Sequence, residues 1–331
     1  MAKMKILYWN PTELENLDYE KEVIGTDSDV ALEIVRGVPD SEFLKYGADA
    51  DAVAVDYLEV TDELLAQMPK VKIFVRRGVG FEQFHLDAFS KHGVLGCNVP
   101  GYCMKEVALH TMVLALSCGR YIAELNARTQ RGDGNYNDIR MYRPDGQVYG
   151  MVSLGRIPRE VVPALKALGF RVATWDPYLP QSVCDELGVE RVDELDNLLA
   201  MSDYVSVNTP LNDSTRGLMS REHLEKMKKG AIIVCSSRGG IIDEDALADL
   251  LRRGHLAGAG LDVLADEVTF KTPLLGLKNV ILTPHVAYYS EEAEVDLRTQ
   301  VVEMMYKALK NGEYPSDSLL NKDVIGKSRI D

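Results

Sequence analysis

The feature that most constrains the fold of this chain is a repeated alternation between short apolar runs and helix-compatible runs. One series ends before Pro100, and a second begins after residue 147. The apolar runs are short and rich in β-branched residues, as buried parallel strands are. Strands and helices that alternate through short turns favour doubly wound parallel sheets. The sequence therefore predicts an α/β protein with two such sheets, which is a common arrangement for 331 residues.

The expected elements follow this alternation closely. Strands are predicted over 5–9, 30–35, 52–55, 71–75, 93–99, 148–152, 171–175, 204–208, 231–235, 258–263 and 280–283. Helices are predicted over 61–68, 104–124, 159–168, 192–201, 220–228, 243–253 and 290–311. The last helix should stop at Asn311-Gly312, because glycine commonly ends a helix. The polar segment 126–147 is expected to be a connecting excursion, and 313–331 to be irregular.

Composition limits the function classes that are open to the chain. A formal net charge of −14 argues against a nucleic-acid or anionic-membrane surface, since both need basic patches. No apolar run approaches the ~20 residues of a membrane span. Five cysteines without paired metal-ligand spacing favour a reducing compartment and no metal site. We therefore expect a cytoplasmic protein that binds neither nucleic acid nor membrane.

A candidate dinucleotide turn lies at 150–158, with the sequence GMVSLGRIP. The Gly-x-Gly-x-x-Gly fingerprint would place glycines at 153, 155 and 158, and this chain has Ser153, Gly155 and Pro158 there. Gly155 keeps the middle position, where the backbone approaches the pyrophosphate. Pro158 falls in the first helical turn, where a missing N–H costs little. The turn can therefore form, and its helix N-terminus can attract phosphate.

The second half of the fingerprint is an acid at the end of the next strand. Asp176 lies 23 residues after Ser153, close to the ~20 residues expected. A carboxylate there accepts ribose hydroxyls and repels a 2′-phosphate, so it favours NAD over NADP. Pro177 and Tyr178 follow it, and no arginine is in place to hold that phosphate. By itself the motif also fits a βαβ crossover without a ligand.

Three later strands are followed by residues whose side chains are charged or can transfer protons: Arg238, Glu267 and His285. Their segments read VCSSRGGIIDEDAL (234–247), LAGAGLDVLADEV (256–268) and VILTPHVAYYS (280–290). Ligands bind outside the carboxyl ends of the strands in open parallel sheets, so the three groups should face one crevice. An arginine suits a carboxylate or carbonyl, a histidine transfers protons near neutral pH, and a glutamate can orient it. Singly, each could be structural, solvated or paired across a loop; together they indicate a site.

These segments resemble the D-isomer-specific 2-hydroxyacid dehydrogenase family over almost the whole chain. The resemblance rests on SSRGGIIDEDALADLLRRGHLAGAGLDVLADE, LKNVILTPHVAYYSEEA and VRRGVGFEQFHLDAFSKHGVLGCNVPGY. Within the family, WDPYLP and HVAYYSE look most like the branch of the carboxy-terminal binding protein co-repressors and their dehydrogenase relatives, which usually has tryptophan where Tyr288 stands.

The resemblance implies two domains with a cleft between them. A flavodoxin-like substrate-binding domain would comprise 1–101 plus 290–331, and a Rossmann NAD-binding domain would comprise 102–289. It further implies a homodimer formed through the NAD domain. The reaction would be hydride transfer between NAD(H) and a small D-2-hydroxy acid or 2-oxo acid.

The resemblance also assigns roles to residues. Arg238 would orient the 2-oxo acid, His285 would be the acid/base, and Glu267 would support His285. The substrate would contact Arg76, Gly78, Val79, Gly80 and Tyr288. The cofactor would contact Thr111, Ser153, Gly155, Arg156, Ile157, Asp176, Asn208, Thr209, Pro210, Ser237 and Asp262.

Departures from the family pattern lie on the cofactor side and leave two alternatives open. Glycine is usual where Ser153 and Pro158 stand, histidine is common at Asn208, and Thr-Ala usually occupies 236–237, which are Ser-Ser here. One alternative is acid/base chemistry without hydride transfer, such as elimination or hydration. The other is a nucleotide-binding regulatory protein.

Overall fold

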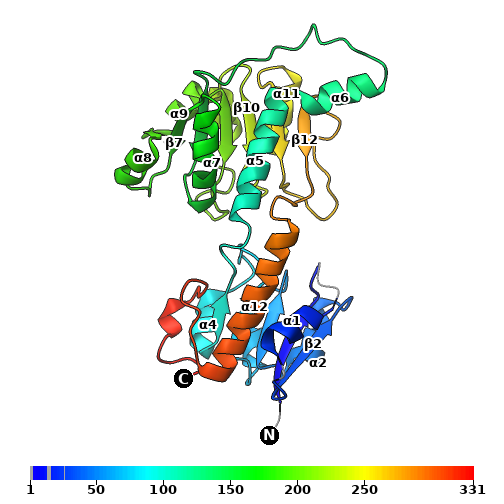
Figure 1. Ribbon diagram of the computed structural model, residues 1–331, viewed down its shortest axis with the longest axis vertical. Helices are drawn as coiled ribbons and strands as arrows, with labels where there is room; N and C mark the ends of the chain where they lie inside the picture. Colours follow the sequence, from blue (N-terminus) through cyan, green and yellow to red (C-terminus); the bar gives the residue numbers. More distant parts are fainter. Residues whose placement is uncertain (1–2, 13–15, 26) are drawn as a thin grey trace. The chain divides into compact units, whose positions relative to one another are not determined.

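The computed structural model describes residues 3–12, 16–25 and 27–331. The chain divides into two compact units, Met1–Tyr102 with Ser290–Asp331, and Cys103–Tyr289. Each unit is built on its own parallel sheet (Figure 1). The prediction of an α/β protein with two parallel sheets is confirmed.

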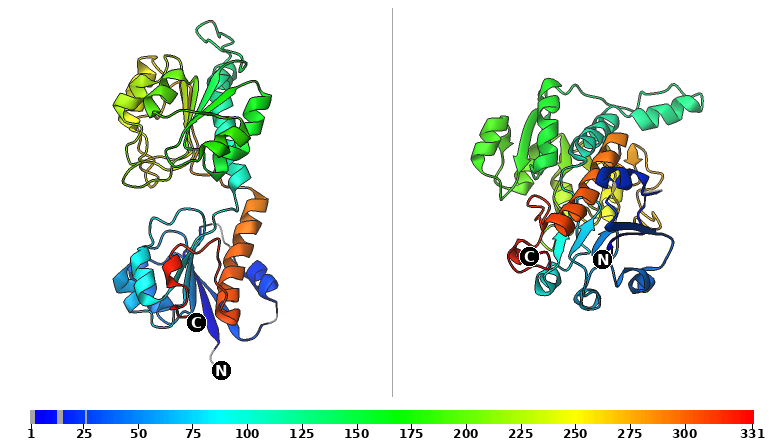
Figure 2. Two further views of the ribbon diagram at one scale, coloured as in Figure 1. Left: turned by 90° about the vertical axis from the view of Figure 1, so that its left-hand side faces the viewer. Right: turned by 60° about the horizontal axis from the view of Figure 1, so that its bottom comes forward.

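The first unit carries a five-stranded sheet in the order β2-β1-β3-β4-β5. Its elements are β1 (Met4–Trp9), α1 (Asp18–Ile24), β2 (Val30–Val35), η1 (Asp40–Glu42), α2 (Phe43–Gly47), β3 (Ala52–Val55), α3 (Asp62–Ala66), β4 (Ile73–Arg76), α4 (Leu86–His92), β5 (Leu95–Cys97), α12 (Glu291–Asn311) and η2 (Lys322–Val324). The strand order is that of flavodoxin-like sheets. Helix α12 contacts α1, β3 and β4 of this unit (Figure 2).

The second unit carries a seven-stranded sheet in the order β12-β11-β10-β9-β6-β7-β8. Its elements are α5 (Met104–Gly119), α6 (Ile122–Gln130), β6 (Val148–Val152), α7 (Arg156–Ala167), β7 (Arg171–Trp175), α8 (Gln181–Leu187), β8 (Glu190–Arg191), α9 (Leu195–Met201), β9 (Tyr204–Val207), α10 (Arg221–Lys226), β10 (Ile232–Cys235), α11 (Glu244–Arg252), β11 (Gly258–Leu261) and β12 (Val280–Leu282). The chain reverses its direction of winding between β6 and β9, which are neighbours. A dinucleotide-binding sheet offers its crevice at such a switch point.

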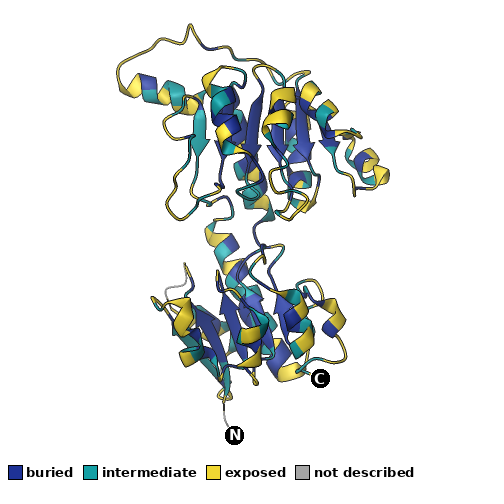
Figure 3. Ribbon diagram, turned by 180° about the vertical axis from the view of Figure 1, so that it is seen from behind, coloured by how far each residue is buried: buried dark blue, intermediate teal, exposed yellow. Residues whose placement is uncertain are grey.

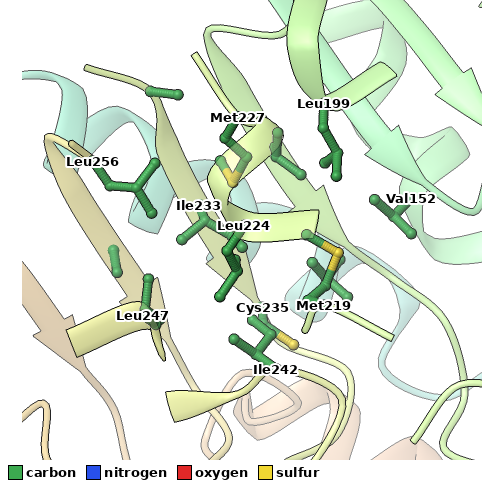
Figure 4. Close-up of a cluster of buried hydrophobic side chains, with 14 of the residues drawn as sticks. Val152, Leu199, Met219, Leu224, Met227, Ile233, Cys235, Ile242, Leu247 and Leu256 are labelled. Atoms are coloured by element: carbon green, nitrogen blue, oxygen red, sulfur yellow. The ribbon is translucent and has the colours of Figure 1, made fainter. Parts of the chain in front are cut away.

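Both faces of the seven-stranded sheet are covered, which explains why its strands read as continuous apolar runs. Helices α5 and α7 pack together on one face, and α5 contacts β10 and β11 (Figure 1). On the other face, Leu199, Leu224 and Leu247 pack with Ile233 in one buried cluster (Figure 4). Burial follows the strands in both units, and exposed residues lie on the outer helix faces and loops (Figure 3).

The single long helix predicted over 104–124 is wrong, because the chain forms two helices, α5 and α6. Helix α5 ends at Gly119, where an added Cβ would lie 2.0 Å from the Tyr204 hydroxyl. Tyr121 then adopts a left-handed backbone with φ of 53° before α6 begins. The excursion predicted over 126–147 therefore starts as helix and continues without regular structure to β6.

Helix ends elsewhere follow local chemistry. Ser290 caps α12, since its side chain accepts a hydrogen bond from the Ala293 amide, and Gly312 ends the helix in a left-handed conformation. The predicted stop at Asn311-Gly312 is thus confirmed. Helix α7 starts three residues earlier than expected, at Arg156, with Gly155 as its N-cap. It also contains Pro163, whose missing N–H removes one helical hydrogen bond.

Candidate active site

His285 and Glu267 form a hydrogen-bonded pair beyond the carboxyl ends of β12 and β11. His285 Nδ1 lies 2.8 Å from Glu267 Oε2, and both side chains are about one-third exposed. The His285 backbone is left-handed, with φ of 54°, and its amide donates to the carbonyl oxygen of Asp262 at 2.8 Å. This unusual backbone turns the histidine out of the strand direction and toward Glu267. The pair leaves Nε2 as the ring atom available to a ligand.

The environment of Glu267 keeps its carboxylate ionised. Burial raises the pKa of Glu267, whereas the hydrogen bond and the charge of His285 lower it. The hydrogen bond from the Leu264 amide and the charge of Arg238 also lower this pKa, and together these effects outweigh the burial. The net result is a pKa below the ordinary glutamate value. A negative Glu267 can only accept a hydrogen bond, so it fixes the tautomer of His285 that carries a proton on Nδ1.

Arg238 lies in the turn that follows β10, and its Nη1 donates to the Ser237 carbonyl oxygen at 2.7 Å. The adjacent Gly239 packs directly against the loop that carries Glu267. An added Cβ at Gly239 would lie 1.8 Å from the Leu264 carbonyl oxygen. Glycine is therefore required at 239 for the Arg238 and Glu267 loops to approach each other.

Asp262 holds the loop that carries His285, a role that the sequence did not reveal. Its side chain is 1% exposed and accepts hydrogen bonds from the Val286 amide at 3.0 Å and the Ala287 amide at 2.9 Å. It also accepts from Thr283 Oγ1 at 2.6 Å, and Thr283 Oγ1 lies 3.0 Å from His110 Nε2. The aspartate predicted to line the cofactor groove is thus already engaged with the backbone beside His285. The residues around Asp262 do not indicate this role in the sequence, because the role depends on the geometry of the loop.

The candidate dinucleotide turn joins β6 to α7 as predicted. Ser153 adopts a left-handed backbone with φ of 76°, which non-glycine residues rarely do. Gly155 is exposed, and an added Cβ there would have nothing within 4 Å among the described residues. Pro158 is buried in the first turn of α7, where its ring is tolerated. Arg156 is exposed and Ile157 half-buried at the same helix start.

Asp176 follows β7 and lies against this turn. Its Oδ2 accepts hydrogen bonds from Ser153 Oγ and from the Leu154 amide, each at 3.0 Å. Its Oδ1 accepts from the Tyr178 amide at 3.0 Å. The two halves of the fingerprint are therefore in direct contact.

Four other predicted cofactor residues follow the carboxyl ends of β9 and β10: Asn208, Thr209, Pro210 and Ser237. Asn208 Nδ2 donates to the Ser153 carbonyl oxygen at 3.3 Å, which joins the end of β9 to the turn. Ser237 Oγ donates to the Val207 carbonyl oxygen at 3.2 Å, and the exposed Pro210 follows Thr209. Thr111 lies on α5, and its hydroxyl donates to the Val107 carbonyl oxygen at 2.7 Å.

Two buried hydroxyls at this edge fit a polar ligand. Thr209 Oγ1 and Ser236 Oγ are buried with no hydrogen-bond partner among the described residues. Buried hydroxyls are normally partnered, so this pair is suited to contacts from a bound molecule. The open space at Gly155 and the helix N-terminus of α7 suit a pyrophosphate. These residues thus fit a dinucleotide.

The residues predicted to hold the substrate carboxylate lie in the first unit, at the end of β4 and in the loop that follows it. Arg76 Nη1 donates to the Arg77 carbonyl oxygen and lies so close to Gly78 that a Cβ there would clash with it. Gly78 has φ of 134° and accepts a hydrogen bond from the Val99 amide at 2.9 Å, while the Val79 carbonyl oxygen accepts from Asn98 at 2.6 Å. Gly80 is buried in the same loop. Tyr288 belongs to the second unit, where its ring contacts that of Tyr289 edge-on.

A second guanidinium, that of Arg77, is buried beside this loop, and no pattern in the sequence indicated it. Arg77 is 3% exposed, and its Nη1 lies 3.2 Å from Asp56 Oδ2, which also accepts from the Thr12 amide. Its Nη2 lies 3.5 Å from Glu294 on α12. Buried charges of this kind fix the loop geometry, because an unpaired partner would be costly.

Residues 112–287 match the model of the D-isomer specific 2-hydroxyacid dehydrogenase, NAD binding domain. That match spans more than half of the chain. The chain belongs to the D-isomer specific 2-hydroxyacid dehydrogenase family. The matched domain makes NAD(H) its cofactor, in agreement with the fit of the residues above.

Relatives of the family resemble this chain over most of its length. It is 36% identical over 280 residues to the D-3-phosphoglycerate dehydrogenase of Methanocaldococcus jannaschii, covering 84% of this chain and 53% of that protein. It is 34% identical over 274 residues to the hydroxypyruvate reductase of Thermotoga maritima, covering 81% of this chain and 88% of that protein. The chain thus spans about half the length of the phosphoglycerate dehydrogenases that it matches.

A solved structure shares the fold throughout. D-lactate dehydrogenase from Aquifex aeolicus, complexed with NAD and lactic acid, aligns with a TM-score of 0.84 and 26% identity. The alignment covers 96% of this chain and 99% of that one.

Over the described ranges, no helix is long and apolar enough to cross a membrane. Within the same part of the chain, no group of three or more His, Cys, Asp or Glu side chains could hold a metal ion.

Proposed function

We propose that this chain is an NAD(H)-dependent dehydrogenase of D-2-hydroxy acids that acts mainly as a reductase of small 2-oxo acids. The observation that carries the proposal is the hydrogen bond between His285 and Glu267, at the same sheet edge as the dinucleotide turn. The family match and the names of its relatives support the same reaction.

In reduction, His285 gives a proton from Nε2 to the carbonyl oxygen of the substrate, because Nδ1 is engaged with Glu267. Glu267 holds the orientation of the imidazole through this hydrogen bond. Arg238 binds the 2-oxo acid by its guanidinium and polarises the carbonyl. These side chains cannot supply the hydride, which would come from a reduced nicotinamide cofactor when one is bound. Oxidation uses the same groups in reverse, with His285 as the base.

The cofactor is held by the turn after β6 and the ends of β9 and β10. The N-terminus of α7 at Gly155 would bind the pyrophosphate. The buried hydroxyls of Thr209 and Ser236 would form hydrogen bonds with the cofactor. Asp176 favours NAD over NADP, since its negative charge repels a 2′-phosphate. Arg76 and the backbone of Gly78, Val79 and Gly80 hold the substrate carboxylate, and Tyr288 shapes the pocket for the substrate side chain.

A homodimer formed through the second unit is part of the proposal. Helix α5 exposes Leu109 and Val113, which are 57% and 48% exposed and four residues apart. Neighbouring α6 adds the exposed Ile122. An apolar stripe on a helix is what a symmetric partner would cover. The five cysteines are buried free thiols, which supports a cytoplasmic location.

The comparisons give no support to elimination or hydration chemistry, or to a purely regulatory role. The deciding experiment measures NADH oxidation with glyoxylate, pyruvate, hydroxypyruvate and longer 2-oxo acids. Wild-type protein should oxidise NADH, and His285→Ala should lose about 10²-fold to 10⁴-fold in rate while still binding NADH. His85→Ala is the matched control, because that histidine is exposed in the first unit. A folded wild-type protein that is inactive on the whole panel would refute the proposal.

A further inference from the structure

Asp176 already accepts several hydrogen bonds from the protein, which leaves few acceptor sites for the ribose hydroxyls of a cofactor. An ionised carboxylate offers about four lone-pair sites, two on each oxygen. Oδ2 accepts from Ser153 Oγ and the Leu154 amide, and Oδ1 accepts from the Tyr178 amide. Within the described residues, three of these sites are thus filled before any ligand arrives.

Ser153 is the unusual donor among the three. Its hydroxyl must donate, because the carboxylate can only accept. A glycine in its place would have no hydroxyl and would adopt φ of 76° without strain. The bond from Asn208 Nδ2 to the Ser153 carbonyl oxygen fixes the serine from the other side. Ser153 is therefore held with its hydroxyl on Oδ2.

We propose that Ser153 limits the affinity for the cofactor, because it competes with the adenosine ribose for Asp176. A ribose diol brings two O–H donors, and only one acceptor site on Asp176 remains for them. The chain then recognises the ribose through Oδ1 alone and binds NADH less tightly than the free carboxylate would allow. The charge of Asp176 is unchanged, so a 2′-phosphate is still repelled. This inference rests on the NAD(H)-dependent function proposed above.

The test is calorimetric titration of NADH and NADPH into wild type, Ser153→Ala and Ser153→Gly. Both variants free one site on Oδ2, so each should bind NADH about tenfold to 150-fold more tightly, as one hydrogen bond to a charged group would give. NADPH should remain the weaker ligand in all three proteins. Ser153→Ala keeps the Cβ at a positive φ, so its gain cannot come from relief of backbone strain.

Two controls isolate the contact. In an Asp176→Ala background, Ser153→Ala should change NADH affinity by less than twofold, because the contested carboxylate is absent. Ser90→Ala is the matched control, since Ser90 Oγ donates to Asp323 Oδ1 at 2.7 Å in the first unit. It should leave NADH binding unchanged. Thermal unfolding of each variant establishes that it is folded.

The outcomes separate this inference from the proposed function. Unchanged or weaker NADH binding by Ser153→Ala would overturn the competition, and so would tightening by Ser153→Gly alone. Tightening of equal size in the Asp176→Ala background would also overturn it. Failure of folded wild type to bind NADH would instead refute the NAD(H)-dependent function.

Discussion

His285 Nδ1 lies 2.8 Å from Glu267 Oε2, and the two residues come from separate loops after β12 and β11. Because the pair fixes the tautomer and orientation of the imidazole, Glu267→Gln should lower kcat/KM for 2-oxo acid reduction about 100-fold. Steady-state rates of NADH oxidation at pH 7 measure this loss. NADH affinity should change little, and a large loss of binding would contradict the assigned role.

Acid stability should also depend on Glu267. Its folded-state pKa lies below the ordinary value of about 4.3, despite partial burial, because of His285. A lowered pKa gives stabilisation that is complete above the ordinary value and is lost as pH falls through the lowered one. Urea unfolding at pH 7, 5 and 3.5 should show Glu267→Gln losing less stability on acidification than wild type. Identical pH dependence in both proteins would argue against the ion pair.

Asp262 should support both stability and activity, because it is nearly inaccessible and accepts from two loop amides and Thr283. Asp262→Asn places an NH2 group against some of these donors and should cost about 2 kcal/mol in unfolding free energy. It should also reduce kcat, since the His285 loop is no longer fixed. Asp193→Asn is the control, because the Asp193 side chain is 92% exposed. Denaturant unfolding and kinetics check both effects, and wild-type behaviour of Asp262→Asn would count against the loop role.

Gly239→Ala should impair catalysis without removing a chemical group. The new methyl would lie 1.8 Å from the Leu264 carbonyl oxygen, so the Arg238 and Glu267 loops must move apart. A displacement of this size at a site that needs exact alignment should lower kcat/KM at least 10-fold. Gly134→Ala is the control, because no described atom lies within 4 Å of an added Cβ there. Equal rates for the two variants would mean that the loops tolerate the shift.

The α5 face should control the oligomeric state. Leu109→Asp combined with Val113→Asp places two charges on the exposed apolar stripe and should convert a dimer to a 36.8 kDa monomer. Size-exclusion chromatography with light scattering measures this. Ile325→Asp, at an exposed residue of the first unit, should leave the dimer intact. A wild-type protein that is monomeric at micromolar concentration would refute the dimer.

Much of the fold was predictable, because buried parallel strands read as short apolar runs. β6 and β7 match the predicted ranges of 148–152 and 171–175. The break between α5 and α6 was not predictable, since it lies at the left-handed backbone of Tyr121, a conformation that tyrosine rarely adopts. Helix α8 was missed because Cys184 is the one buried residue among its seven, so no apolar stripe marks it in the sequence.

The sequence predicted the positions of Arg238, Glu267 and His285 beyond strand ends, where open parallel sheets bind ligands, but it did not predict their contacts. Their catalytic roles stay predictions. The bond from Ser153 to Asp176 was not visible, since it needs the left-handed backbone of Ser153. Asp262 supports the His285 loop through backbone amides, and a sequence does not display such bonds.

The most direct test of the proposed dehydrogenase function is reduction of a 2-oxo acid by NADH, followed by chiral analysis of the product. Wild type should consume NADH and form the D-2-hydroxy acid, and His285→Ala should form almost none while it still binds NADH. NADH binding without hydroxy-acid formation on any substrate of the panel, or formation of the L-isomer, would contradict it.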